Sequence, residues 1–257
     1  MQKLIKLAVF FGSLVFAIPL TAQNLVIKPY YGYLHLLPQM KDVNKQITRQ
    51  IEGWREELNE PISFPGKFNG AHFVGAEIQY HLSNDYVLAM DFFFFRESVG
   101  TSEKIMIGAL PYFFAYGRRV ESFDVVAKLH YYFDYKPESR FNKYIGLGGG
   151  PVFAKAKSVT VIFLNEAGFD GERRPVDAQD SFSKTSLTAV ISAGADFRLL
   201  NFISLWGEAG YQYAKVGQIK GTVRQLDDML NTAFPTESSI DLSGFYFRTG
   251  LGIRLPF

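Results

Sequence analysis

Residues near the end of the chain alternate between apolar and polar or small side chains with a period of two. One face of the segment Phe245–Phe257 carries Phe, Thr, Leu and Ile, whereas the other carries Tyr, Arg, Gly and Pro. This period is that of a β-strand, because successive side chains of a strand point to opposite faces. The segment therefore predicts a strand that separates an apolar environment from a polar one.

Seven further segments show the same alternation, and each is near or above the roughly 9–11 residues that a tilted membrane-spanning strand needs. Short connections alternate between them with four long ones, residues 37–70, 96–121, 155–183 and 215–240. Outer-membrane barrels have short periplasmic turns and longer extracellular loops. The eight segments are Asn24–Leu36, Ala71–Leu82, Tyr86–Phe95, Phe123–Phe133, Lys143–Phe153, Thr185–Arg198, Ile203–Tyr213 and Asp241–Phe257.

The pattern predicts an all-β fold, an eight-stranded antiparallel transmembrane β-barrel with four long extracellular loops and a short helix in the first loop. A closed barrel leaves no unpaired strand edge facing lipid, and an even number of strands puts both termini in the periplasm. Ten strands are the alternative, because Ile105–Ala115 is apolar enough to extend a strand or to form a short helix. A soluble lipocalin-like barrel should show the reverse polarity, with apolar residues inside.

The N-terminus has the composition of a secretory signal peptide. Lys3 and Lys6 precede the uncharged apolar run Leu7–Leu20, and small residues follow at Thr21 and Ala22. Such a run is too short for a retained membrane helix. We therefore expect residues 1–22 to be cleaved and residues 23–257 to form the outer-membrane barrel domain.

Composition narrows the range of partners. The 27 bases and 25 acids give a formal charge of +2, and loss of the signal peptide, with its two lysines, would leave equal numbers of each. No basic stretch suggests nucleic acid. The chain has no cysteine, which excludes disulfides and cysteine metal sites. Its 25 Phe and 14 Tyr fit the aromatic girdles of a membrane barrel.

The inner faces of the predicted strands carry five bases and five acids. An eight-stranded barrel has an interior just wide enough for side chains to fill it, and buried charges there must be paired. We interpret the balanced set as an ionic network that fills the lumen, with a narrow pore for small solutes as the alternative. The ten residues are Lys28, Glu77, Asp91, Asp124, Lys128, Asp196, Arg198, Glu208, Arg248 and Arg254.

The first long loop contains a helix-like stripe of apolar residues. Val43, Ile47, Ile51, Trp54 and Leu58 recur at intervals of three or four residues, which is the period of an amphipathic helix. We expect this helix either to cap the mouth of the barrel or to present a surface that binds lipopolysaccharide sugars or a partner.

Three segments resemble the small outer-membrane β-barrel family, the group of the OmpA transmembrane domain, OmpX and the opacity proteins. They are Tyr144–Pro151 (YIGLGGGP), Gly207–Tyr211 (GEAGY) and the C-terminal strand. Phe257, as a final aromatic residue, resembles the signature that the barrel-assembly machinery reads. The resemblance implies a monomeric, porin-like cell-envelope protein of the bacterial outer membrane that contacts outer-membrane lipid and lipopolysaccharide. Roles in the family range from adhesion to envelope integrity.

Nothing in the motifs indicates an enzyme. Lipid-modifying enzymes built on small barrels need a serine beside a histidine, and no His-x-Ser sequence or Gly-x-Ser-x-Gly elbow is present. His72 is the one candidate histidine, without a nameable partner. The four histidines show no metal-ligand spacing, so we expect no catalytic, metal or cofactor site.

Overall fold

The computed structural model describes residues 25–36, 40–107, 110–133, 136, 139–164, 178–225 and 233–255. The predicted signal peptide and Phe257 lie outside these residues. Within them the chain forms ten strands and one helix. The elements are β1 (Leu25–His35), α2 (Lys41–Leu58), β2 (Gly70–His81), β3 (Tyr86–Ile107), β4 (Leu110–Phe133), β5 (Phe141–Leu164), β6 (Ala178–Arg198), β7 (Ile203–Tyr213), β8 (Lys215–Gln225), β9 (Ala233–Asp241) and β10 (Gly244–Arg254).

Eight of the described strands close into a barrel. Neighbouring strands pair antiparallel in the order β1, β2, β3, β4, β5, β6, β7 and β10, and β10 pairs back onto β1. The two remaining strands do not enter this ring, because β8 pairs with β6 and β9, and β9 pairs with β8 among the described strands. The predicted eight-stranded antiparallel barrel is confirmed, and the ten-stranded alternative is wrong.

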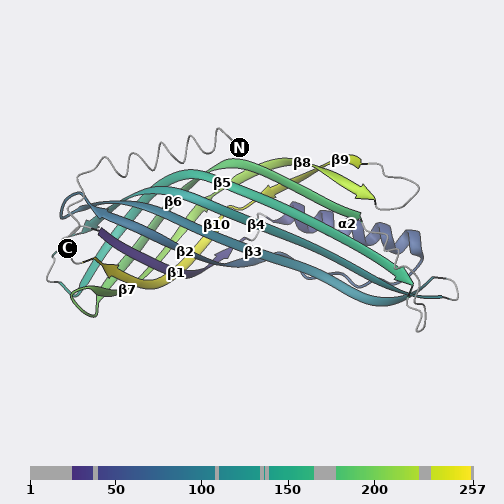
Figure 1. The fold of residues 1–257 in the computed structure, drawn as a ribbon, viewed down its shortest axis with the longest axis horizontal. Helices are drawn as coiled ribbons and strands as arrows, with labels where there is room; N and C mark the ends of the chain where they lie inside the picture. Colours follow the sequence, from purple (N-terminus) through teal and green to yellow (C-terminus); the bar gives the residue numbers. More distant parts are fainter. Residues whose placement is uncertain are drawn as a thin grey trace.

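The two ends of the barrel differ. One end, here called the turn end, carries the short connections at residues 82–85 and 199–202. At the opposite end, here called the loop end, β3 to β6 run on past β1 and β2 and are joined by β8 and β9. These parts form a curved sheet, here called the extension, and α2 lies along it (Figure 1).

Helix α2 covers the inner face of the extension. Val43, Ile47 and Ile51 are buried in one apolar core with Phe114 of β4, and Trp54 packs edge-on against Phe114 at 6.3 Å between ring centroids. The residues of the predicted helical stripe are thus on the packed face of the helix, with Trp54 and Leu58 partly buried.

Polar contacts fix the position of α2. The Tyr116 hydroxyl donates a hydrogen bond to Gln50 (2.8 Å), and Arg118 donates one to Gln46 (3.2 Å). Asn44 binds both the backbone N–H and the carbonyl of Phe68, which ties the returning chain to the helix. The helix therefore closes over the extension instead of projecting from it.

The strands are longer than the alternation indicated. Most of the ranges assigned to the second and third long loops, residues 96–121 and 155–183, continue β3 to β6, and β8 and β9 lie in the fourth. The reason is visible in β4, where the polarity of the two faces is exchanged along the strand. In the barrel Leu129 points outward and Lys128 inward, whereas in the extension Arg119 points outward and Val120 inward beneath α2.

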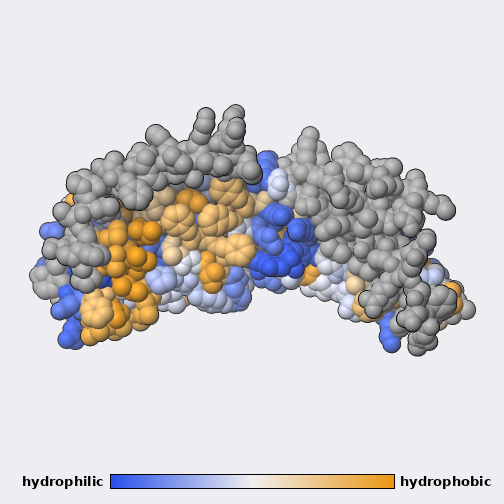
Figure 2. Space-filling view, viewed as in Figure 1, coloured by the Kyte–Doolittle hydropathy of each residue, from blue (hydrophilic) through white to orange (hydrophobic). Residues whose placement is uncertain are grey.

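The outer face of the closed barrel is apolar. Figure 2 shows apolar side chains gathered over the half of the molecule that holds the barrel, next to a hydrophilic zone toward the extension. This face, here called the apolar belt, shows the polarity of a membrane barrel rather than that of a soluble one. Its exposed residues include Tyr31, Val74, Ile78, Phe94, Phe123, Leu129, Ile145, Leu147, Ile191, Leu205, Phe247 and Leu251.

No helix in the described ranges is long and apolar enough to cross a membrane.

Candidate functional site

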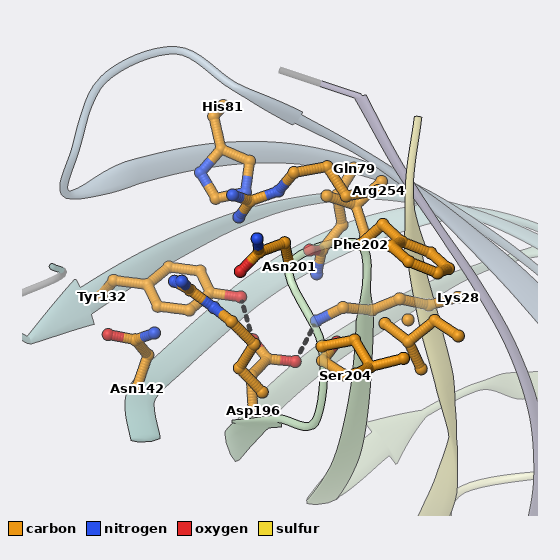
Figure 3. A pocket seen from close by; sticks show the side chains of 15 residues that line it. Lys28, Gln79, His81, Tyr132, Asn142, Asp196, Asn201, Phe202, Ser204 and Arg254 are labelled. Atoms are coloured by element: carbon orange, nitrogen blue, oxygen red, sulfur yellow. Dashed lines mark hydrogen bonds and ion pairs between the residues drawn. The ribbon is translucent and has the colours of Figure 1, made fainter. Parts of the chain in front are cut away.

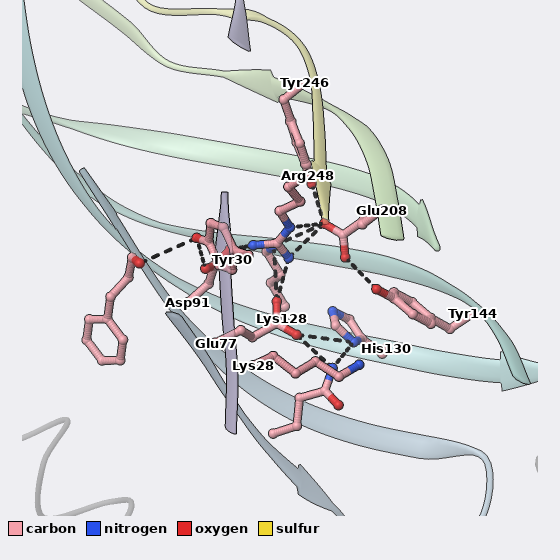
Figure 4. A network of polar contacts seen from close by, with 12 residues as sticks. Lys28, Tyr30, Glu77, Asp91, Lys128, His130, Tyr144, Glu208, Tyr246 and Arg248 are labelled. Carbon is pink, nitrogen blue, oxygen red and sulfur yellow. Dashed lines mark hydrogen bonds and ion pairs between the residues drawn. The ribbon is translucent and has the colours of Figure 1, made fainter. Parts of the chain in front are cut away.

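Arg248 lies at the centre of the barrel lumen and binds three carboxylates from three strands. Its Nη1 lies 2.6 Å from Asp91 of β3, and its Nη2 lies 2.6 Å from Glu77 of β2 and 2.8 Å from Glu208 of β7. The side chain is 1% exposed. Since Arg248 belongs to β10, these contacts connect four strands across the interior (Figure 4).

Lys128 of β4 completes the cluster. Its Nζ lies 2.6 Å from Asp91, 3.4 Å from Glu208 and 3.5 Å from Glu77. Three buried carboxylates therefore share two buried bases. A planar guanidinium offers several donors in a fixed fork, so Arg248 can serve three acceptors at once. We call Glu77, Asp91, Lys128, Glu208 and Arg248 the central cluster.

Three tyrosines surround the central cluster and donate to its carboxylates. Tyr30 binds Asp91 at 2.5 Å, and Tyr246 and Tyr144 bind Glu208 at 2.7 and 3.1 Å. The Arg248 guanidinium carbon also lies 4.5 Å from the centroid of the Tyr30 ring, a cation–π distance. The tyrosine hydroxyls therefore donate to carboxylate lone pairs that do not accept a hydrogen bond from Arg248 or Lys128.

Glycines make the room for these rings. Each of the three tyrosines lies directly opposite a glycine on the next strand, and a Cβ atom at that glycine would collide with the ring. At these three positions the lumen is therefore filled by a tyrosine ring on one strand that occupies the space above a glycine on the neighbouring strand. The pairs are Tyr30 with Gly75, Tyr144 with Gly194, and Tyr246 with Gly210.

A histidine lies beside the central cluster. Gln79 donates to Glu77 (2.7 Å) and lies 3.2 Å from His130 Nδ1, and the His130 ring stacks on Tyr144 at 4.7 Å. Atoms of Glu77, His130 and Glu208 lie within 4.8 Å of one another, a spacing that could hold a metal ion. Both carboxylates already bind Arg248 and Lys128, so a divalent cation would have to displace two bases.

Toward the loop end, the lumen stays closed. Asp124 accepts hydrogen bonds from Ser122 and from Gln212, the latter at 2.9 Å. The space left between Asp91, Lys128, Arg248 and neighbouring apolar residues measures about 10 Å³. That volume is at the lower limit for one water molecule, so side chains fill this level of the lumen.

Toward the turn end, the lumen opens into a small vestibule. Lys28 and Asp196 form an ion pair of 2.6 Å, and Tyr132 donates to the same carboxylate at 2.6 Å. The cavity measures about 50 Å³, and Arg198, Arg254 and His81 also line it (Figure 3). The vestibule has room for a few waters, and Gln79, which binds Glu77 of the central cluster, forms part of its wall.

Comparison with solved structures agrees with this architecture. The outer membrane protein OprG from Pseudomonas aeruginosa matches with a TM-score of 0.50 at 12% identity, over 92% of this chain and 97% of that chain. Neisserial surface protein A matches with a TM-score of 0.40 at 11% identity, over 90% of this chain and 97% of that chain. This chain has the fold of the small outer-membrane β-barrels. No family model matches the chain, and no curated protein matches it.

The structure places the ten charges predicted for the lumen at three levels, which are the central cluster, the vestibule and the region toward the loop end. Glu77, Asp91, Lys128, Glu208 and Arg248 form the central cluster, Lys28 pairs with Asp196, and Asp124 lies apart toward the loop end. Arg198 and Arg254 line the vestibule and are only partly buried. The set of ten held only residues predicted to be charged. The tyrosines, Gln79 and His130 belong to the same network, and the alternation of their strands places them on the same inward faces.

His72 lies on the outer face, away from this network. Its Nδ1 is 2.5 Å from the Tyr31 hydroxyl, and its ring packs between Tyr31 and Tyr33. The buried carboxylates of the lumen are bound by Arg248, Lys128 and Lys28 or, in the case of Asp124, by Ser122 and Gln212, and among the described residues His72 contacts none of them.

Proposed function

We propose that the protein is an integral, non-enzymatic barrel of the bacterial outer membrane whose lumen is sealed by the central cluster. The observation that carries this proposal is Arg248, buried in the lumen and bound to carboxylates on three other strands. A conducting lumen would need these charges to be hydrated and separated. Here they contact one another directly at 2.6–2.8 Å.

In this proposal the extension and α2 act outside the cell, and both chain ends face the periplasm. Short turns on one side and long segments on the other support this orientation. The rigid barrel would then hold the extension in the medium, where it could contact other molecules. Surface segments on rigid scaffolds often carry recognition. Monomeric insertion by the barrel-assembly machinery, through Phe257, belongs to the same proposal.

Cysteine labelling tests the location and the orientation together. The chain contains no cysteine, so each introduced thiol is unique. Glu52→Cys lies on the exposed side of α2, and Asn84→Cys lies exposed in the short connection between β2 and β3. In intact cells a membrane-impermeant maleimide should label Glu52→Cys, whereas Asn84→Cys should react only after the outer membrane is permeabilised.

The opposite labelling pattern would reverse the proposed orientation. Equal labelling of both variants in intact cells, with the protein absent from the outer-membrane fraction, would refute the membrane location. Heat-dependent migration on a gel checks in the same samples that both variants form the barrel.

A further inference from the structure

A group of bases lies on the outward face of the extension, directly beyond the apolar belt. Antiparallel register puts Arg96 of β3, Glu121 of β4 and Lys155 of β5 side by side in one row. The next row brings Arg119 of β4 beside Lys157 of β5. We call the four bases, Arg96, Arg119, Lys155 and Lys157, the basic patch.

Aromatic rings lie next to the basic patch, on the side that faces the turn end. Phe94, Phe123 and Phe153 occupy the row two residues nearer the turn end, and the rings of Phe123 and Phe153 stack at 6.2 Å. Two residues of strand span roughly 7 Å, so the charges and the rings could contact the headgroup and the first chain carbons of one lipid.

A groove connects the two rows. It measures about 450 Å³, and its lining includes Phe94, Phe123 and Phe153 together with Glu121 and Lys155. The groove is therefore apolar at one end and charged at the other. That is the polarity of an amphiphile whose acyl chains point toward the apolar belt.

Within the part of the chain that the structure describes, a single carboxylate forms ion pairs with the basic patch. Glu121 lies 3.5 Å from Arg96 and 3.9 Å from Arg119, so it is shared between two bases. Among the described residues, no carboxylate lies within ion-pair distance of Lys155 or Lys157. Four bases with one acid leave a surplus of positive charge at the level of the lipid headgroups.

We propose that the basic patch binds the phosphate groups of a phosphorylated glycolipid of the outer leaflet, whose acyl chains lie on Phe94, Phe123 and Phe153. This inference rests on the proposed function, because only that orientation places the extension at the outer leaflet. A lipid fits better than a soluble anion, since Lys155 lines the same groove as the three rings and the other three bases lie in the same row or the next one.

Lipid binding to the purified full-length protein in detergent tests the proposal. Native mass spectrometry would compare lipid A that carries both phosphates with dephosphorylated lipid A of the same acyl chains. The wild type should retain the phosphorylated form, and Lys155→Gln combined with Lys157→Gln should weaken that binding about 30-fold. Each base near an anionic lipid surface contributes about 1 kcal/mol, which sets this expected loss.

Lys104→Gln is the matched control, because Lys104 is exposed on the outward face of β3 but lies eight residues beyond Arg96. It should bind lipid as the wild type does. Equal binding of both lipids, or unchanged binding in the double variant, would overturn the proposal. Displacement of the lipid by excess inorganic phosphate would also overturn it, by making the basic patch a small-anion site.

A failure of the lipid-binding proposal can be distinguished from a failure of the proposed function. If Glu52→Cys is labelled outside cells but the phosphates make no difference, only the lipid inference fails.

Discussion

Replacing Arg248 by methionine tests whether the central cluster holds the barrel together. The substitution keeps much of the side-chain volume but removes the charge that contacts Glu77, Asp91 and Glu208 at 2.6–2.8 Å. The three buried carboxylates would then face Lys128 alone. Removing one partner of a buried ion pair costs about 3–5 kcal/mol, because the remaining charges stay buried without compensation.

We expect Arg248→Met to lower the free energy of unfolding by about 3–5 kcal/mol, measured by urea titration of the protein folded in zwitterionic vesicles. Arg96→Met is the matched control. Arg96 is 51% exposed and has one surface ion pair of 3.5 Å, so its loss should cost at most about 1 kcal/mol. Equal effects of the two substitutions would refute the reasoning.

The charge balance of the central cluster also predicts which substitution, of an acid or of a base, lowers the free energy of unfolding more. Since three acids face two bases, neutralising an acid relieves repulsion, whereas neutralising a base increases it. Glu208→Gln should therefore cost about 2 kcal/mol less than Arg248→Met, because it leaves two acids facing two bases, whereas Arg248→Met leaves three acids facing one base. A larger cost for Glu208→Gln would show that hydrogen bonding, and not charge, dominates the cluster.

Further predictions concern α2, the packing of β5 and the C-terminus. Replacing residues 41–58 by a Gly/Ser linker should leave heat-modifiable migration intact but make the extension sensitive to protease; loss of the barrel would show that α2 is part of its folding core. Gly150→Ala should destabilise the barrel by about 1–3 kcal/mol in urea titration, because its Cβ would collide with the Val125 carbonyl, whereas Gly53→Ala on α2 meets open space and should not. Deleting Phe257 should reduce the amount of protein in outer-membrane fractions; wild-type levels would count against the assembly signature.

The barrel-forming part of each of the eight strands could be predicted because it obeys one rule. Lipid favours apolar residues outside, and the packed lumen favours polar or small residues inside, so alternation identifies both the strand and its faces. The same rule identified the members of the central cluster. It could not say that they meet, because contact across the lumen depends on the stagger of strands as distant in sequence as β2 and β10.

The extension could not be predicted by that rule because its polarity is the opposite. Val120 and Phe114 point inward beneath α2, and Arg119 and Glu121 point outward into polar surroundings. A search for apolar residues on the outward face stops where the belt ends. The alternation of apolar and polar residues continues past this point, but the apolar residues move from the outward to the inward face. That change of face was the sequence signal for the boundary between the barrel and the extension.

Conductance across a planar bilayer tests the central claim, a membrane barrel sealed by its own charges, most directly. The same protein sample should first show heat-modifiable migration, so that a silent bilayer cannot result from unfolded protein. After insertion, confirmed by protease protection of the strands, the wild type should give no stable current above that of the lipid alone. A reproducible single-channel conductance from the wild type would contradict the account, because the central cluster would then have to be hydrated and open.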